Sequence, residues 1–92
     1  MNEFDPAALD CLAALADEQG FERAAQRLAI TQSAVSQRLR ALETQVGQPL
    51  VVRSRPLRLT EAGKVLLRFA RQLQALRVDV ARELGSLPPR SA

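Results

Sequence analysis

The sequence contains no histidine, no tryptophan and no tyrosine, and it has a single cysteine, Cys11. One cysteine cannot form an intramolecular disulfide, and the absence of histidine removes the commonest zinc ligand, so we expect a reducing compartment and no metal site. Three phenylalanines are too few for a surface that stacks single-stranded bases. Without a recognisable acid, base or metal constellation, the chain is not expected to be an enzyme or to hold a cofactor.

Long apolar runs are also missing. No stretch approaches the roughly 20 apolar residues of a membrane span. Residues 1–22 contain six acids and no base, which is unlike a signal peptide. We therefore expect a cytoplasmic protein without a membrane partner.

Basic charge is concentrated in the later part of the chain. Residues 23–92 carry all thirteen bases against four acids, a net charge of +9, whereas the whole chain of 92 residues carries +3. This asymmetry predicts one face for a polyanion and another kept away from it. Ordinary solubility charge is the alternative. A chain of this length forms one small domain with a modest core, so oligomerisation is an expected source of further stability.

Residues 21–47 carry the most informative pattern. Two apolar sets at helical spacing are separated by a tight turn at residues 28–31, and Thr31 is a suitable N-cap for a second helix at about residues 32–46. The apolar residues of this helix form one narrow stripe: Val35, Leu39, Leu42 and Val46. The other side carries polar residues: Gln32, Ser33, Ser36, Gln37, Arg40 and Thr44. Amides, hydroxyls and a guanidinium suit base edges and phosphates, so the pattern predicts the recognition helix of a helix-turn-helix.

A first helix is predicted to precede this unit. Asp5 is a suitable N-cap, Pro6 is a favoured first helical residue, and Gly20 is expected to end the helix as its C-terminal cap. Cys11 falls within this helix. We expect it to be a buried structural side chain, because no base lies beside it.

After Gly47 the pattern changes to two short β-prone runs, residues 50–53 and 57–59. Residues 54–56 join them, which predicts a small hairpin or wing. The three arginines of this segment are expected to reach a phosphate backbone or a minor groove: Arg53, Arg55 and Arg58. A solvated loop that happens to be basic is the alternative.

A long last helix is predicted over residues 60–85, capped by Thr60 and slightly weakened by Gly63. Its apolar residues follow a heptad spacing: Leu66, Phe69, Leu73, Leu76, Val80 and Leu84. Such a helix is longer than a small domain can cover, so we expect these residues to form an interface with a second copy of the chain. Folding of the helix back onto the first helix is the alternative.

Six motifs follow one another in a specific order and spacing. They are Phe21-x-x-Ala24-Ala25-x-x-Leu28, TQSAVS at residues 31–36, Leu39-x-x-Leu42-Glu43, Gly47-x-x-Leu50, Arg53, and Leu59-Thr60-x-Ala62-Gly63. With them, residues 4–87 resemble the N-terminal winged helix-turn-helix and linker helix of LysR-type transcriptional regulators. The resemblance implies a mainly helical fold with a small β wing and sequence-specific binding of double-stranded DNA. Residues 21–43 and 47–56 are especially similar to the ArgP/LysG branch, which regulates basic amino-acid export and related genes.

The resemblance implies roles for five residues, Gln32, Ser33, Ser36, Arg53 and Arg55, and the residue types beside them add Thr31, Gln37, Arg40 and Arg58. The expected base contacts are Gln32, Ser33, Ser36 and Gln37. The expected contacts of the DNA backbone and wing are Thr31, Arg40, Arg53, Arg55 and Arg58. Many members have proline where Ser33 stands and arginine where Gln37 stands, and the wing looks one residue shorter than in many relatives.

The expected organisation is a winged helix-turn-helix domain at residues 1–59, a linker and dimerisation helix at residues 60–85, and the start of a hinge at residues 86–92. Family members usually continue into an effector-binding domain, so we expect the DNA-binding part of a longer bacterial protein, or a natural truncated regulator. The resemblance implies antiparallel pairing of two linker helices, a tetrameric full-length protein, and a small-molecule effector bound only by the absent C-terminal domain. A helical module that binds protein instead of DNA is the remaining alternative.

Overall fold

The structure is a computed structural model, and it describes residues 4–90. Residues 1–3, in the predicted domain 1–59, and residues 91–92, in the predicted hinge, lie outside this described part. Within it the elements follow in the order α1 (Pro6–Glu18), α2 (Phe21–Leu28), α3 (Gln32–Val46), β1 (Val51–Val52), β2 (Arg58–Leu59) and α4 (Glu61–Ser86). This mainly helical architecture with a small hairpin confirms the predicted fold class.

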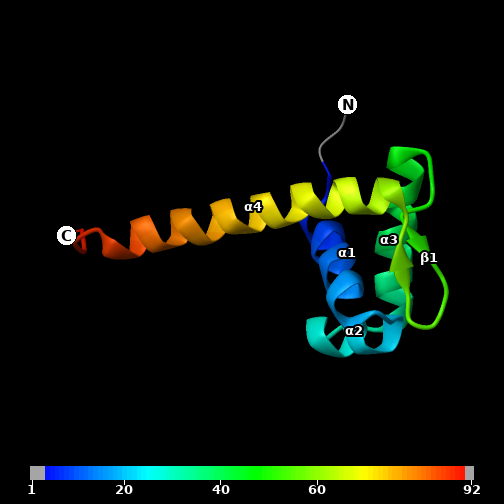
Figure 1. Ribbon diagram of the computed structural model, residues 1–92. Helices are drawn as coiled ribbons and strands as arrows, with labels where there is room; N and C mark the ends of the chain where they lie inside the picture. The colour runs from blue at the N-terminus through cyan, green and yellow to red at the C-terminus, as the bar shows by residue number, and fades with distance from the viewer. Residues whose placement is uncertain (1–3, 91–92) are drawn as a thin grey trace.

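Helices α1, α2 and α3 form a bundle, and α4 crosses it and then leaves it as a long arm that carries the C-terminal end away (Figure 1). Helix α1 is the centre of the bundle, because both α3 and the first half of α4 pack against it. The largest fully buried side chains come mostly from α1 and α3: Leu9, Leu12, Leu15, Val35, Leu39 and Leu42. The apolar stripe predicted for residues 32–46 therefore faces the core.

The junction between α1 and α2 differs from the prediction. Asp5 caps α1 as expected, accepting the Ala7 N–H at 3.1 Å, but the left-handed residue that ends the helix is Gln19, with φ 59°. Gly20 is extended, with φ −172°, and is the N-cap of α2. The expected C-cap role of Gly20 is wrong. Gln19 is held in place by a distant contact, because its carbonyl accepts the Leu57 N–H at 3.1 Å.

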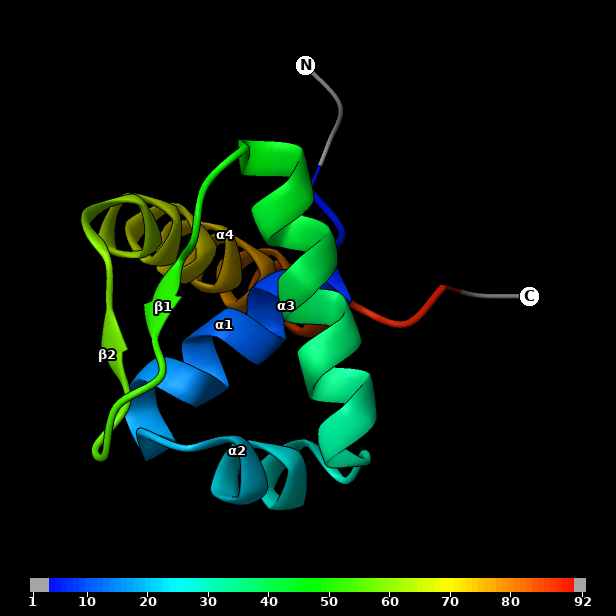
Figure 2. The same cartoon turned by 90° about the vertical axis from the view of Figure 1, so that its right-hand side faces the viewer.

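The hairpin is confirmed. Strands β1 and β2 are antiparallel, with Val51 opposite Leu59 and Val52 opposite Arg58. Between them the Ser54 hydroxyl donates to the Pro56 carbonyl at 2.8 Å, which ties the loop to itself. Viewed from the side, the hairpin and α3 lie on the same face of the domain, with α4 receding behind them (Figure 2).

The start of α4 is built against the base of the hairpin. Thr60 caps the helix as predicted, accepting the Gly63 N–H at 3.0 Å, and its hydroxyl donates to the Pro49 carbonyl at 2.7 Å. Gly63 does more than weaken this turn. A Cβ at this position would overlap the Leu50 carbonyl and approach the Leu59 Cβ to 3.3 Å. A residue without a side chain is therefore required for the close approach of helix and hairpin.

Helix α4 divides into a packed half and an exposed half. Leu66 is buried in the chain's own core at 7% exposure, whereas Leu76 and Leu84 are 61% and 63% exposed. Phe69 lies between these extremes and packs edge-on against Phe4, with ring centroids 6.0 Å apart. The alternative in which the helix folds back onto α1 is thus correct for its first half. Leu66 is removed from the predicted interface, since a residue already buried in its own chain cannot be covered by a second copy.

Candidate nucleic-acid interface

The polar face of α3 is formed as the sequence predicts. Thr31 caps the helix, its side chain accepting the Ala34 N–H at 3.0 Å. Five polar side chains then line one shallow hollow of about 360 Å³ on the outer side of the helix: Gln32, Ser33, Ser36, Gln37 and Arg40. The structure therefore brings together all four predicted base-reading residues and one predicted backbone contact.

The turn before α3 presents this face outward. Helix α2 ends at Ala29, which is left-handed with φ 56°, and the Ile30 N–H donates to the Ala25 carbonyl at 3.1 Å. The chain reverses there within three residues, and the half-buried Ile30 side chain packs against the core. This geometry leaves the first turns of α3 accessible, as an α-helix must be to enter a DNA major groove about 12 Å wide.

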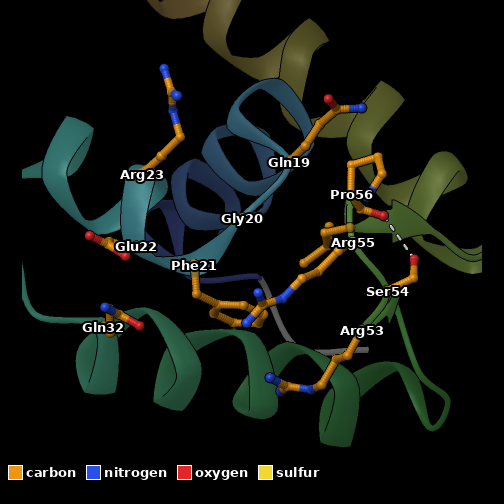
Figure 3. A pocket seen from close by; sticks show the side chains of 11 residues that line it. Gln19, Gly20, Phe21, Glu22, Arg23, Gln32, Arg53, Ser54, Arg55 and Pro56 are labelled. Atoms are coloured by element: carbon orange, nitrogen blue, oxygen red, sulfur yellow. Dashed lines mark hydrogen bonds between the residues drawn. The ribbon is translucent and has the colours of Figure 1, made fainter.

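A second hollow separates the hairpin from the start of α2. This cleft of about 480 Å³ is lined by residues of the α1–α2 junction, by Gln32 and by the hairpin loop. Arg53 and Arg55 reach from the hairpin into the cleft, whereas Arg23 points away from it (Figure 3). The peptide bond between Arg55 and Pro56 is cis.

One of these arginines is oriented by an aromatic ring. The Arg53 guanidinium lies over the Phe21 ring, 4.5 Å from its centroid, which is a cation–π geometry. The sequence pattern includes Phe21 only in the first of the six motifs and gives no sign of this contact, because Phe21 and Arg53 are far apart in the chain. Phe21 is thus a supporting residue of the candidate interface that the sequence analysis missed.

Arg58 is not brought together with the other two hairpin arginines. It lines a separate hollow beside α4, together with Lys64 and Arg71. The three predicted wing contacts therefore point to two different sides of the hairpin, and only Arg53 and Arg55 adjoin the recognition helix.

Ion pairs join acids of residues 1–22 to bases of residues 23–92. Asp17 binds Arg27 at 2.8 Å and Arg71 at 2.7 Å. Further pairs are Glu18 with Arg23 and Arg27, at 3.6 and 3.5 Å, and Asp10 with Arg77, at 3.7 Å. The acids of α1 are thus neutralised by bases of α2 and α4. Within residues 4–90 none of the ion pairs involves Arg40, Arg53 or Arg55, so these three side chains keep an unpaired positive charge beside α3 and the hairpin.

The surroundings of Asp17 shift the pKa of its carboxyl. Hydrogen bonds from Arg71 and then from Arg27 hold the pKa of the Asp17 carboxyl below its ordinary value of 3.8. The carboxylate is therefore charged at neutral pH and keeps both partners. Its role is structural, because it lies on the side of α1 that faces α2 and α4.

Cys11 is fully buried, as expected. Burial raises the pKa of its thiol above the ordinary value of 9.0, and the neighbouring Arg38 offsets this only in part. The expectation that no base lies beside Cys11 is wrong, since Arg38 approaches it from α3. The thiol nevertheless stays protonated and unreactive at neutral pH.

None of the helices in residues 4–90 combines the length and apolar character needed to cross a membrane. In the same part of the chain, no three or more His, Cys, Asp or Glu side chains are grouped so that they could hold a metal ion.

A helix-turn-helix whose second helix presents a polar face beside a basic hairpin is a winged helix-turn-helix of the DNA-binding class. Residues 6–64 match the bacterial regulatory helix-turn-helix proteins of the lysR family. The chain belongs to this family and constitutes its DNA-binding domain. This is a family of regulatory proteins and not of enzymes.

Individual relatives agree with this assignment. The chain is 46% identical over 91 residues to the HTH-type transcriptional regulator ArgP of Aeromonas salmonicida, a match that covers 99% of this chain and 30% of ArgP. Full-length LysG of Corynebacterium glutamicum superposes with a TM-score of 0.87 at 43% identity, covering 90% of this chain and 29% of LysG. A second LysG structure contains the bound effector Arg. The chain thus spans about 30% of the length of the curated relative.

A third relative has been solved with DNA. The DNA-binding domain of BenM in complex with catB site 1 DNA superposes with a TM-score of 0.79 at 28% identity, covering 91% of this chain and 99% of that domain. The isolated DNA-binding domain of this relative therefore binds DNA with a fold similar to that of this chain. The alternative of a module that binds only protein is not supported.

Proposed function

We propose that this chain binds a pseudo-palindromic operator as a homodimer in the bacterial cytoplasm and regulates genes of basic amino-acid export or related functions. The hollow on α3, with its four polar side chains and Arg40, is the observation that carries the proposal. The target genes are inferred from the relatives, which include ArgP and a LysG with bound Arg.

The N-terminal half of α3 reads the bases in this proposal. The exposed Gln32 and Gln37 amides offer both donors and acceptors, and an amide can form two hydrogen bonds to adenine. Ser33 and Ser36 can donate to or accept from any base edge that faces them. Together they supply sequence preference, because phosphate contacts alone carry no sequence information.

Charged and backbone groups around this face bind the phosphates. Arg40 lies at the C-terminal end of the hollow, and Arg53 and Arg55 approach from the cleft at the other side of Gln32. Thr31 sits at the positive end of the α3 dipole, where an anionic phosphate is favoured. Arg58 would contact the backbone from the outer side of the hairpin. This arrangement places phosphate contacts on both sides of the base-reading residues.

Dimerisation is assigned to the apolar side chains of α4 between Phe69 and Leu84. The apolar side chains that remain uncovered by the chain's own core include Phe69, Leu76, Val80 and Leu84. In an antiparallel pair, a two-fold axis between Gln74 and Ala75 places Phe69 opposite Val80 and Leu73 opposite Leu76. Every one of these layers is apolar, as the seam of a coiled coil requires. The pair would present its recognition helices at half-sites about one helical turn of DNA apart.

We assign effector recognition and assembly into a tetramer to the part of the relatives' length that this chain does not match. The basis is the length of ArgP and LysG, of which this chain covers about 30%. We take a basic amino acid as the effector, because a LysG structure contains Arg.

The experiment is a salt series of binding to two duplexes, one of random sequence and one pseudo-palindrome selected from a randomised library. The mass of the free protein is measured by light scattering in the same buffers. We expect a dimer that binds both duplexes at low salt with a steep loss as salt rises, and that retains only the palindrome at higher salt. A dimer that binds neither duplex, or a preference that never appears, overturns the proposal.

A further inference from the structure

The contact between α1 and two other helices suggests how the geometry of the dimer is set. We propose that Asp17 is a positioning residue that fixes the angle between α4 and the helix-turn-helix, and with it the separation of the two recognition helices. The inference rests on the proposed dimer through α4. It concerns which residue sets the dimer's geometry, and not whether the dimer forms.

One carboxylate joins three helices. Asp17 lies in the last turn of α1, its Oδ1 accepts a hydrogen bond from Arg71 of α4 at 2.7 Å, and its Oδ2 accepts one from Arg27 of α2 at 2.8 Å. Both distances are those of charge-assisted bonds. Helix α2 is the first helix of the helix-turn-helix and holds the start of α3, so the carboxylate links the linker helix to the unit that carries the recognition helix.

The apolar core holds α4 along a different side. Leu66 and Ala70 are buried, and Leu73 is the last residue of α4 that packs against the core. Contacts of this kind fix how closely two helices approach, but they run along one line and resist rotation about it only weakly. Arg71 lies off that line and ties the flank of the helix to α1. The Asp17–Arg71 ion pair at 2.7 Å, together with the longer Asp10–Arg77 pair at 3.7 Å, therefore restrains a motion that the core leaves comparatively free.

The length of α4 amplifies small changes of angle. Residues 74–86 extend about 20 Å beyond Leu73 at 1.5 Å per residue. A tilt of about 10° at the last core contact moves the far end by about 3.5 Å, which is close to the rise of one base pair. Because the proposed interface is centred between Gln74 and Ala75 and continues along this half to Leu84, the angle at Asp17 decides the spacing at which two recognition helices meet the DNA.

The chain offers a matched control. Glu18 pairs with Arg23 at 3.6 Å and with Arg27 at 3.5 Å, and both of these partners lie in α2 and not in α4. Glu18→Gln therefore removes a similar exposed charge from the same turn of α1 while it leaves the Asp17–Arg71 bond in place. Any effect of Asp17→Asn that Glu18→Gln lacks belongs to the link with α4.

The test measures the distance between the recognition helices in the free dimer. A nitroxide is attached at Thr44→Cys, an exposed position of α3, and the distance distribution is recorded by pulsed electron resonance. The buried Cys11 should take up no label, which the unsubstituted chain checks. We expect Asp17→Asn and Arg71→Gln each to broaden the distribution or shift its mean by about 3 Å. Glu18→Gln and Arg71→Lys should leave the distribution unchanged. The double variant that combines Asp17→Asn with Arg71→Gln should change it no more than either single variant does.

The outcomes distinguish the positioning role of Asp17 from the existence of the proposed dimer. An unchanged distribution in both Asp17→Asn and Arg71→Gln dimers overturns the positioning role. A wild-type chain that shows no dipolar coupling and the mass of a monomer overturns the proposed dimer instead. Thermal unfolding of each variant is recorded first. If Asp17→Asn is unfolded, Arg71→Gln and its rescue by Arg71→Lys decide the question alone.

Discussion

The Glu43 carboxylate accepts a hydrogen bond from the Leu50 backbone N–H at 2.9 Å. The acceptor lies in the last turn of α3 and the donor at the start of the hairpin, so the bond sets the hairpin against the recognition helix. The Leu50 carbonyl in turn accepts the Thr60 N–H at 3.0 Å, at the start of α4. Leu50 is therefore the residue through which α3, the hairpin and α4 are held together.

Removal of the Glu43 acceptor should destabilise the fold. Glu43→Ala leaves the partly buried Leu50 N–H without its partner, and we expect a loss of about 1–3 kcal/mol in the free energy of unfolding. Glu43→Gln keeps an acceptor oxygen and should lose less. Glu61→Ala is the control, since Glu61 is exposed and forms only a 3.3 Å pair with Lys64. Urea denaturation measures all three, and equal losses for Glu43→Ala and Glu61→Ala would contradict the role of the bond.

Two glycines of α4 should respond to alanine in opposite directions. In a helix interior alanine is normally favoured over glycine by about 1 kcal/mol. Gly85 has nothing within 4 Å of a Cβ, so Gly85→Ala should be neutral or stabilising. At Gly63 the Cβ would overlap the Leu50 carbonyl, so Gly63→Ala should lower the midpoint of thermal unfolding. A rise of the midpoint for Gly63→Ala would show that α4 can move away from the hairpin without loss of stability.

The parts of this fold that the sequence predicted are those governed by local rules. The caps at Asp5, Thr31 and Thr60 depend on hydrogen bonds within three residues, and all three are present. The polar face of α3 follows from helical periodicity, because the buried stripe of this helix leaves only one outward direction. For the same reason the four predicted base-reading residues line one hollow.

The errors all involve contacts between distant parts of the chain. Gly20 was expected to cap α1, but the hydrogen bond from Leu57 favours the left-handed turn one residue earlier, at Gln19. Leu66 fits a heptad seam by spacing, and only the position of α1 shows that it belongs to the core. Phe21 beneath Arg53 is a further example. Periodicity gives the face of a helix and cannot tell which neighbour will cover it.

The stabilising effect of Asp17 should depend on pH. Because its folded pKa is held below the ordinary value of 3.8, its contribution is complete above that value and is lost as the pH falls through the folded pKa. The side chain is 35% exposed, so solvent screening limits the gain at pH 7 to about 0.2–1 kcal/mol. Urea denaturation of the wild type and Asp17→Asn should show this difference at pH 7 and none below the folded pKa. A gap that persists in acid would mean that the asparagine disturbs packing and that the lost charge is not the cause.

The antiparallel register of α4 can be tested with one introduced cysteine per chain, because the native Cys11 is buried. Phe69→Cys and Val80→Cys chains are prepared separately, mixed and oxidised, and the products are separated without reductant. We expect a covalent dimer from the mixture and little from either chain alone, because the proposed axis places Phe69 opposite Val80. Val78→Cys is the control, since Val78 is exposed but lies on another side of α4. Efficient cross-linking of Phe69→Cys with itself would indicate parallel helices and contradict this register.

Base reading and phosphate binding should separate when Gln32 and Arg55 are replaced. Gln32 lines both hollows of the candidate interface, whereas Arg55 lines only the cleft beside the hairpin. Gln32→Ala should weaken binding to the selected palindrome by about 1–3 kcal/mol per half-site and change binding to random DNA little. Arg55→Ala should weaken both and flatten the dependence on salt by about one phosphate contact per subunit.

Fluorescence anisotropy with both duplexes at several salt concentrations measures the two effects together. Each variant is the control for the other, because both sites lie beside the same cleft and differ in the chemistry assigned to them. A parallel loss on both duplexes for Gln32→Ala would remove it from the base-reading set. An unchanged salt dependence for Arg55→Ala would mean that its guanidinium does not reach a phosphate, and that Arg53, held over Phe21, is the hairpin residue that does.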